Sequence, residues 1–389
     1  MSKYLTVPQM KAEIERCLQC PNKPCQKACP VACCPQDFIA KAKAGDYEGA
    51  VQSICQNNPL GQTCGLICPD NFCMKACVRR NLDEAIRIPK LQATLLEKYR
   101  KNTKRQTPSP NGLSVAVMGA GPAGLAAAEK LSSWGYEVTI FEQEDKIGGA
   151  LNLIPSSRLP FEVIKKDGDF ILSSDLVKIY YGMKISSPQV LLCNFDAVIV
   201  ATGEPNSLNL NIEGEDLLLT HLEYLKNPDK YATDGNVAVI GGGAVATDCA
   251  VTAKQLGAAN VEMFVRRRLS DMRVSDREYQ ELLHYEIDIT TMTCPEKVEQ
   301  DGETLALLTA RNELVDGKIV KLKDSVIRRK GFKYIIKAVG SRADKFVDSD
   351  KVFYAGDCKN GGSTIVEAIA SGQQTAHKVH NYLTPQTEE

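Results

Sequence analysis

The stretch from Val115 to Glu142 constrains the fold more than any other, because it reads as a strand, a tight turn, a helix, a second strand and an acid. The turn carries the pattern G-x-G-x-x-G. One glycine permits the turn, one lets the backbone approach a pyrophosphate, and one allows the helix to pack closely on the strand. The helix N-terminus favours phosphates, and the final carboxylate can accept from a ribose hydroxyl. The pattern predicts a dinucleotide site, against the simpler alternative of a glycine-rich turn in an ordinary α/β unit. The candidate residues are Gly119, Gly121, Pro122, Ala123, Gly124 and Glu142.

A second unit, residues 236–268, repeats this design with the pattern G-x-G-x-x-A. Its second strand, Val261–Val265, runs into three arginines where the first unit ends in an acid. A carboxylate there favours the free 2′-hydroxyl of NADH, whereas arginines can pair with the 2′-phosphate of NADPH, so the run favours NADPH over NADH. The alternative is a basic run that only faces solvent. The candidate residues are Gly241, Gly243, Ala244, Ala246, Arg266, Arg267 and Arg268.

Several loops outside these two units could complete a flavin site. The strand Phe195–Val200 ends in a small-residue turn, which suits close approach to a dinucleotide, although a plain tight turn would look the same. Asp357 follows a short strand and could take hydrogen bonds from a ribityl chain, while the helix opening at Ser363–Thr364 could stabilise a reduced isoalloxazine. We therefore expect FAD on the first unit and an exchanging NADPH or NADH on the second. Candidate cofactor contacts from these loops are Gly149, Arg158, Ala201, Thr202, Gly203, Gly340, Gly356, Asp357, Ser363 and Thr364.

The chain has 15 cysteines, and eleven of them lie at or before Cys77. They concentrate in two groups, Cys17–Cys29 and Cys64–Cys77, and each group contains a cysteine–proline pair. Short loops let several thiolates converge on one cluster, and a fourth cysteine followed by proline often ligates a neighbouring cluster. The pattern predicts two iron–sulfur clusters. A disulfide framework would need an oxidising compartment, and zinc, the competing metal, usually needs only four ligands.

Composition and length predict a soluble protein of two or three domains. The 389 residues are 43% hydrophobic and 24% charged with a net charge of −1, which gives no reason to expect nucleic acid or an anionic membrane as a partner. We expect a cytoplasmic protein, because no apolar run approaches the roughly 20 residues of a membrane span and the start has no signal-peptide core. Residues 98–112 read as a linker.

The expected fold class is α/β, with two Rossmann-like dinucleotide-binding domains, one inserted in the other, preceded by an α-helical domain that holds the clusters. The expected boundaries are 1–105 for the α-helical iron–sulfur domain, 106–232 and 335–389 for the FAD-binding domain, and 233–334 for the NAD(P)H-binding domain.

These motifs together resemble one known family over nearly the whole chain. The runs CLQCPNKPCQKACP and NPLGQTCGLICPDNFCMKAC, both glycine patterns, ATG, and AGD with its STIVEAIASG helix are similar to the flavin and iron–sulfur subunits of bacterial NAD(P)-dependent dihydropyrimidine dehydrogenases. That family is related to the N-terminal half of the mammalian enzyme and to glutamate synthase small subunits. The run Leu60–Gly65 lacks the G-R-x-C-P pattern usual in the glutamate synthase subunits, which favours the pyrimidine family.

The resemblance implies two 4Fe–4S clusters. One would use Cys17, Cys20, Cys25 and Cys77, and the other Cys29, Cys68, Cys73 and Gln92. From its own surroundings in the sequence, Gln92 would be a surface helix residue. Cys64 matches a family position that is not a ligand. Cys33, Cys34 and Cys55 have no assigned role, and the Cys33–Cys34 pair departs from the family pattern, which leaves a swapped ligand open.

The implied function is an electron-transfer subunit that oxidises NAD(P)H through FAD and both clusters, and passes electrons to a partner. That partner would carry FMN and further clusters and would reduce uracil or thymine. The chain itself shows no acid–base pair for substrate chemistry. Of its four histidines only His377 and His380 have metal-like spacing, and we expect them on an exposed C-terminal helix. The alternatives are the small subunit of a glutamate synthase-like or other NAD(P)H:acceptor oxidoreductase, and a redox-sensing scaffold with a degenerate cluster domain.

Overall fold

The computed structural model describes residues 2–100, 105, 107–346 and 349–384, and these residues form two compact units. The first unit spans Met1–Asn152, Ser156–Pro205 and Ala343–Glu389, and the second spans Leu153–Pro155 and Asn206–Arg342. The second unit is therefore an insertion in the first. None of the helices within the described ranges has both the length and the hydropathy that a bilayer span requires.

The N-terminal part of the first unit is built from short helices. Helices α3 and α4 form a hairpin, which turns at Gly45 with a φ of +85° and restarts where Asp46 caps the Gly49 N–H. Helix α1 begins at a capping box in which Thr6 and Gln9 satisfy each other's backbone N–H groups. The helices are α1 (Val7–Arg16), α2 (Pro24–Lys27), α3 (Pro35–Lys43), α4 (Tyr47–Asn57), α5 (Gly61–Ile67) and α6 (Ile88–Tyr99), with a 3-10 turn η1 (Val78–Asn81).

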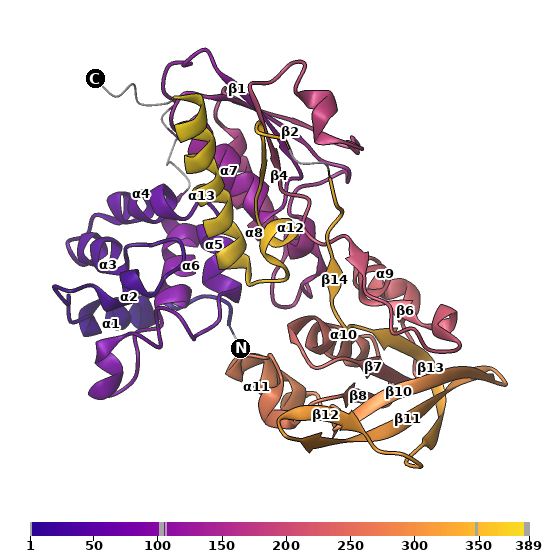
Figure 1. Cartoon of the computed structure of the whole chain (residues 1–389). Helices are drawn as coiled ribbons and strands as arrows, with labels where there is room; N and C mark the ends of the chain where they lie inside the picture. Colours follow the sequence, from indigo (N-terminus) through magenta and orange to yellow (C-terminus); the bar gives the residue numbers. More distant parts are fainter. Residues whose placement is uncertain (1, 101–104, 106, 347–348, 385–389) are drawn as a thin grey trace. The chain divides into compact units, whose positions relative to one another are not determined.

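The rest of the first unit is a five-stranded parallel sheet in the order β15-β4-β1-β2-β3. Figure 1 labels three of these strands, β1, β2 and β4, with helix α7. The strand–turn–helix–strand prediction is confirmed as β1, α7 and β2. Strand β15 and helix α13 return late in the chain. The residues after β15, and helix α13, both pack tightly against Ala123 of α7. A Cβ added to Gly356 would lie 2.8 Å from the Ala123 Cβ, and one added to Gly372 would meet the Ala123 carbonyl. The elements are β1 (Ser114–Met118), α7 (Pro122–Ser132), β2 (Glu137–Phe141), α8 (Phe161–Leu172), β3 (Val177–Tyr180), β4 (Ala197–Val200), β15 (Val352–Tyr354), α12 (Asp357–Asn360) and α13 (Ile365–Leu383).

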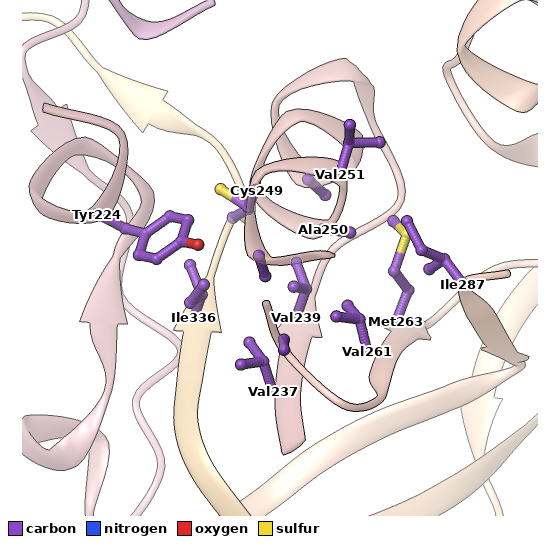
Figure 2. Close-up of a cluster of buried hydrophobic side chains, with 14 of the residues drawn as sticks. Tyr224, Val237, Val239, Cys249, Ala250, Val251, Val261, Met263, Ile287 and Ile336 are labelled. Atoms are coloured by element: carbon purple, nitrogen blue, oxygen red, sulfur yellow. The ribbon is translucent and has the colours of Figure 1, made fainter. Parts of the chain in front are cut away.

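The second unit is organised around an eight-stranded mixed sheet. Strands β13, β7, β8 and β9 are parallel, and β11 and β10 extend the sheet with antiparallel pairs. Figure 2 shows the core on one face, where side chains of α10 meet those of β7, β8 and β13. The elements are β5 (Asn206–Ser207), β6 (Leu219–Thr220), α9 (His221–Lys226), β7 (Asn236–Ile240), α10 (Ala244–Gln255), β8 (Val261–Val265), α11 (Asp276–His284), β9 (Asp288–Thr291), β10 (Thr293–Asp301), β11 (Thr304–Val315), β12 (Lys318–Lys321), β13 (Ile327–Lys337) and β14 (Ser341–Arg342).

The inserted unit is larger than the expected 233–334. Strand β13 runs to Lys337, and its second half, residues 332–337, pairs with β7, so residues 335–342 stay with the second unit. On the other side, residues 206–232 also belong to it, because β6 pairs with β13 and β5 with β14.

The expected linker 98–112 is only partly within the described residues, since 101–104 and 106 lie outside them. Arg105 is anchored to the end of α7, where its guanidinium donates to the Glu129 carbonyl at 2.5 Å and to the Ser132 hydroxyl at 2.7 Å.

Candidate flavin, nucleotide and iron–sulfur sites

The first glycine turn has one open position between two closed ones. Gly119 has a φ of +102°, and a Cβ there would lie 2.7 Å from the Ala201 carbonyl oxygen. A Cβ on Gly124 would collide with the Gly119 carbonyl. A Cβ on Gly121, in contrast, would find only the Gly149 Cα, at 4.0 Å. The turn therefore presents bare backbone on one side, next to the N-terminus of α7, which fits a pyrophosphate.

The neighbouring loops converge on this turn. The Glu142 carboxylate is 5% exposed and accepts from the Ala120 N–H at 2.7 Å and the Glu144 N–H at 2.9 Å. Each oxygen keeps lone-pair capacity for a ribose hydroxyl. The Gly148 N–H donates to the Ala120 carbonyl at 2.9 Å, which holds Gly149 beside the turn. Buried Oγ1 of Thr202 has no hydrogen-bond partner among the described residues, as expected for an atom that contacts a ligand.

Asp357 lies in the same unit, directly after a glycine whose conformation other residues rarely adopt. Gly356 has a φ of +73°, and the Ser363 hydroxyl donates to the Asp357 carboxylate at 2.6 Å. Burial raises the pKa of Asp357, and the Ser363 bond opposes that rise in part. Thr364 is the N-cap of α13, in a capping box with Glu367. Arg158 lies half-buried in the loop before α8.

Sequence reasoning missed Glu204, which directly follows the Ala201–Gly203 turn. A Cβ on Gly362 would lie 3.4 Å from a Glu204 carboxylate oxygen. Burial raises the pKa of Glu204, and the charge of Asp357 raises it further. The sequence did offer a signal for Glu204, because this acidic residue directly follows a turn that we expect to approach a dinucleotide closely.

The second glycine turn repeats the geometry of the first. Gly241 has a φ of +151° and donates its N–H to Phe264, as Gly119 does to Phe141. A Cβ on Gly241 would meet the Ala338 carbonyl, so the end of β13, leading to Gly340, takes the place of the Ala201–Gly203 turn. A Cβ on Gly243 would meet nothing within 4 Å. This turn too is open where a pyrophosphate would approach.

The strand end beside the second turn has no acid. Because Phe264 corresponds to Phe141, the buried Val265 takes the place of Glu142, and the arginines follow it. Arg266 is exposed and Arg267 half-exposed, whereas the Arg268 guanidinium makes two bonds to Asp271, at 2.9 and 3.0 Å.

Arg273 is a further cation that the sequence did not single out. The backbone N–H of Arg273 donates to the Gly242 carbonyl at 3.0 Å. The exposed Arg273 side chain is therefore attached directly beside the second glycine turn. Ala244 opens α10, and Ala246 is fully buried beneath the turn.

Four cysteines from both ends of the N-terminal segment line one cavity. Cys17, Cys20 and Cys25 come from the first group and Cys77 from the second. Burial raises the pKa of Cys25 to about 11, and the nearby Cys17 and Cys77 sulfurs raise it too. The cavity wall is otherwise mostly apolar, with Leu18, Ile39, Val78, Ile86 and Ile88 among its lining residues. Four thiols around one cavity fit a four-iron cluster.

The second set of cysteines is more deeply buried. Cys73 is 8% exposed, and its pKa is raised to about 12 by burial and then by the charges of Cys29 and Cys25. Burial likewise raises the pKa of Cys68, and the nearby charges of Cys64, Cys73 and Cys29 raise it further. Cys29, Cys68 and Cys73 therefore share one region. Among the described residues, no three His, Cys, Asp or Glu side chains are placed to hold a single metal ion.

The reading of Gln92 as a surface residue is wrong. Gln92 is 5% exposed on α6, its Nε2 donates to the Gly61 carbonyl at 2.6 Å, and its Oε1 accepts from the Cys33 thiol at 3.4 Å. Helix α6 packs on α5, so this face of α6 is interior. The residue lies in the region of the second cysteine set.

Comparisons with known proteins agree with both parts of this site. The family model described as pyridine nucleotide-disulphide oxidoreductase matches residues 113–372, and the model described as dihydropyrimidine dehydrogenase domain II, 4Fe-4S cluster, matches residues 1–104. The NAD-dependent dihydropyrimidine dehydrogenase subunit PreT of Salmonella typhimurium is 30% identical, over 95% of this chain and 94% of its own length. The chain belongs to this family of dehydrogenase subunits. It is an NAD(P)H-dependent flavin oxidoreductase with a 4Fe–4S region.

More distant relatives share the family's architecture. The glutamate synthase (NADPH) small chain of Azospirillum brasilense is 29% identical over 97% of this chain and 89% of its own. Among solved structures, FprA of Mycobacterium tuberculosis in complex with NADPH aligns with a TM-score of 0.62 at 16% identity, covering 70% of this chain and 84% of that one. The similarity to FprA shows that the two proteins share a fold over the matched part of this chain.

Among the residues that the structure describes, the histidines belong to no group that could hold a metal ion. His377 is exposed on α13, as expected, but His380 is half-buried and bonds the Tyr136 hydroxyl at 2.9 Å. Both rings pack against Trp134. Their i, i+3 spacing therefore serves the packing of α13.

Proposed function

We propose that this chain is the electron-transfer subunit of a dihydropyrimidine dehydrogenase. It would oxidise NAD(P)H, held by the second unit, and pass electrons through FAD and two 4Fe–4S clusters to a partner subunit. The partner would carry FMN and further clusters and reduce uracil or thymine to the 5,6-dihydropyrimidine. The observation that carries the proposal is the cavity lined by Cys17, Cys20, Cys25 and Cys77, in the same compact unit as an open FAD turn.

The residues around the first turn support tight FAD binding. Bare backbone at Gly121 would face the pyrophosphate, Glu142 would accept from a ribose hydroxyl, and Asp357 would accept from the ribityl chain. Bound flavin supplies the conversion of a two-electron hydride donor into single electrons. The chain's own task is to hold the flavin and exclude water around it.

The cysteine sets suggest a direction for the electrons. Helices α4 and α5, which precede the second set, are held against the flavin-binding half. Asp167 of α8 accepts from the Thr63 N–H of α5 at 2.8 Å, and Gln373 of α13 donates to the Asn57 carbonyl of α4 at 2.8 Å. The first set lies around a cavity bordered by Leu18 and Val78, which are 44% and 39% exposed. We infer that the second cluster receives electrons from flavin and the first delivers them at this apolar surface.

The coenzyme is proposed to be NADPH. Val265 offers no carboxylate to a free 2′-hydroxyl, while Arg266, Arg267 and Arg273 lie around the turn and can pair with a 2′-phosphate.

A glutamate synthase-like subunit is the second candidate, favoured by the 29% identity to that small chain over 97% of this one. The two functions differ in the partner, since neither requires this chain to hold substrate.

The deciding experiment is anaerobic purification of the chain with its native partner. We expect FAD, FMN, iron and sulfide in the complex, and NADPH oxidation that depends on uracil or thymine. Oxidation that depends instead on 2-oxoglutarate plus glutamine would select the second candidate. A colourless chain without flavin or sulfide would overturn both.

A further inference from the structure

Gln92 is expected to supply the one ligand of the second cluster that is not a sulfur, and its amide is held in one orientation. Its side chain is buried, and its Nε2 donates to the Gly61 carbonyl at 2.6 Å. A carbonyl oxygen can only accept a hydrogen bond, so the amide atom that faces it must be the nitrogen. The Gly61 carbonyl therefore leaves the Gln92 oxygen, the only atom of the amide with electron pairs to donate, available for other partners.

Two glycines of α5 let this helix come close enough to α6 for that bond. A Cβ on Gly61 would lie 2.9 Å from Leu96 of α6, and one on Gly65 would lie 2.7 Å from the Cβ of Ala93 on the same helix. Helix α5 ends directly before Cys68, which is another expected ligand of the second cluster. The close packing of α5 on α6 therefore links the position of this thiol to that of the amide.

The oxygen of the amide accepts a hydrogen bond from a second buried group, the Cys33 thiol. Sγ of Cys33 lies 3.4 Å from Oε1 of Gln92, and the Cys33 side chain is 4% exposed. The loop that carries Cys33 starts at Cys29, whose carbonyl accepts from the Ala32 N–H at 2.9 Å. Ala32 has a φ of +47°, which is uncommon for a residue with a side chain. A thiol this deeply buried stays protonated, because burial disfavours the thiolate, and it therefore remains a donor.

This hydrogen bond is compatible with iron ligation by the same oxygen. A carboxamide oxygen has two lone pairs, so it can accept from the Cys33 thiol and bind iron at the same time. Net charge and hydrogen bonds around the ligands both affect the reduction potential of a cluster. A donor at a ligand draws negative charge away from it, which favours the reduced form, because that form carries one more negative charge.

We propose that Cys33 is a positioning residue of the second cluster: with the Gly61 carbonyl it orients the Gln92 oxygen, and its hydrogen bond raises the reduction potential of the cluster. The thiol itself binds no iron in this arrangement. The inference rests on the proposed function, since it assumes a second cluster with Gln92 as a ligand. It gives a role to a buried cysteine that belongs to neither expected ligand set.

A matched pair of substitutions separates the hydrogen bond from the packing. Cys33→Val fills the site without a donor, whereas Cys33→Ser keeps a donor. At a fixed potential, we expect Cys33→Val to lower the ratio of reduced to oxidised second cluster about threefold, roughly 28 mV for a one-electron couple. Cys33→Ser should keep the ratio at or above that of the unaltered chain, and the first cluster should not change in either variant. Potentiometric titration of the electron paramagnetic resonance signals of the anaerobically purified chain measures both clusters.

Cys55→Val is the control, because Cys55 is equally buried but lies on α4. An unchanged second-cluster potential in Cys33→Val would overturn the proposal, as would an equal fall in Cys33→Ser or in the control. If Cys33→Val does not assemble the second cluster, Cys33→Ala replaces it as the smaller variant without a donor. Assembly in Cys33→Ser but in neither of these two variants would support the hydrogen bond, and failure in all three would overturn it. An unaltered chain without a second cluster would instead refute the proposed function, so the two failures are distinguishable.

Discussion

Gly121 and Gly243 are the two residues at which the nucleotide turns are open. Both have φ values that any residue can adopt, −75° and −119°. An added methyl group on either would meet no atom of the chain closer than 4.0 Å. The chain itself makes no demand for glycine at these two positions, so we attribute that demand to the proposed ligands, whereas at Gly119 and Gly124 it comes from the chain.

Alanine substitutions at Gly121 and Gly243 should weaken the binding of two different nucleotides. We expect Gly121→Ala to weaken FAD binding and Gly243→Ala to weaken NADPH binding, each by about 1–3 kcal/mol, or roughly 5- to 150-fold, because the methyl group crowds the pyrophosphate. Equilibrium titration of each ligand measures the loss. Each variant serves as the control for the other, and an equal loss of both ligands in either one would refute the assignment.

The arginines at the second site are expected to affect NADPH and NADH binding unequally. Arg267→Ala should weaken NADPH by about 1.5–3 kcal/mol, roughly 10- to 150-fold, with little effect on NADH, because a charged hydrogen bond to the 2′-phosphate is lost. Arg268→Ala should do less, since that guanidinium is already held by Asp271. KM values for both coenzymes test this. Equal losses for NADH and NADPH would remove the argument from these arginines.

Single residues were predictable where a local pattern defines their role. Gly119, Gly124 and the Thr364 cap follow from spacing alone. Gln92 did not, because its burial depends on α5 packing against the face of α6 that carries it. The position of Arg273 could not be predicted either, because it depends on a backbone hydrogen bond to Gly242, which lies thirty-one positions earlier in the chain.

Helix α5 is the element that joins the cysteine segment to the flavin-binding half. Its N-terminal N–H groups on Gln62 and Thr63 point at the Asp167 carboxylate of α8, which satisfies them and complements the helix dipole. Asp167 is fully buried and also pairs with Arg100, which follows α6. One carboxylate thus holds three helices.

Removing that charge should destabilise the first unit strongly. Asp167→Asn leaves Arg100 buried without a counter-charge, which costs about 3–5 kcal/mol. Unfolding followed by flavin fluorescence and by cluster absorbance measures this loss. Asp169→Asn is the matched control, because its pair with Lys165 is exposed and contributes about 0–1 kcal/mol. Equal stability of the two variants would contradict the role given to Asp167.

Most elements were predictable from periodicity, but their ends were less so. The α3–α4 hairpin and strands β1, β2 and β8 follow from apolar spacing and a glycine turn. The length of β13 does not, because its first half is exposed and polar and becomes a strand only by pairing with β11.

At the scale of the whole molecule, the first cysteine cavity lies beside an apolar surface. Leu18 and Val78 line it, and Leu82, the C-cap of η1, is 69% exposed. Exposed apolar side chains beside the proposed site of the first cluster suit a partner that would receive electrons there. Domain boundaries belong to this scale too, and they were the hardest to predict, since they depend on which sheet the chain rejoins.

A charge on this surface should uncouple the partner without affecting the flavin. Leu82→Asp should leave NADPH-driven dye reduction unchanged and lower pyrimidine-dependent turnover with the partner by at least about tenfold, a cost of about 1.4 kcal/mol in docking. Val190→Asp, at a side chain 56% exposed elsewhere in the first unit, is the control. Full turnover in Leu82→Asp would place the exit elsewhere.

The tight fit of Ala123 against Gly356 and Gly372 has a consequence for biosynthesis. As the ribosome makes the chain, the cysteine helices and the first glycine turn emerge early, yet the sheet beneath that turn lacks β15 until residue 354 is added. The inserted unit, ending at Arg342, is complete before then. We therefore expect the inserted unit of a nascent chain to fold before the first unit can close, and flavin capture to await the synthesis of β15 and α13.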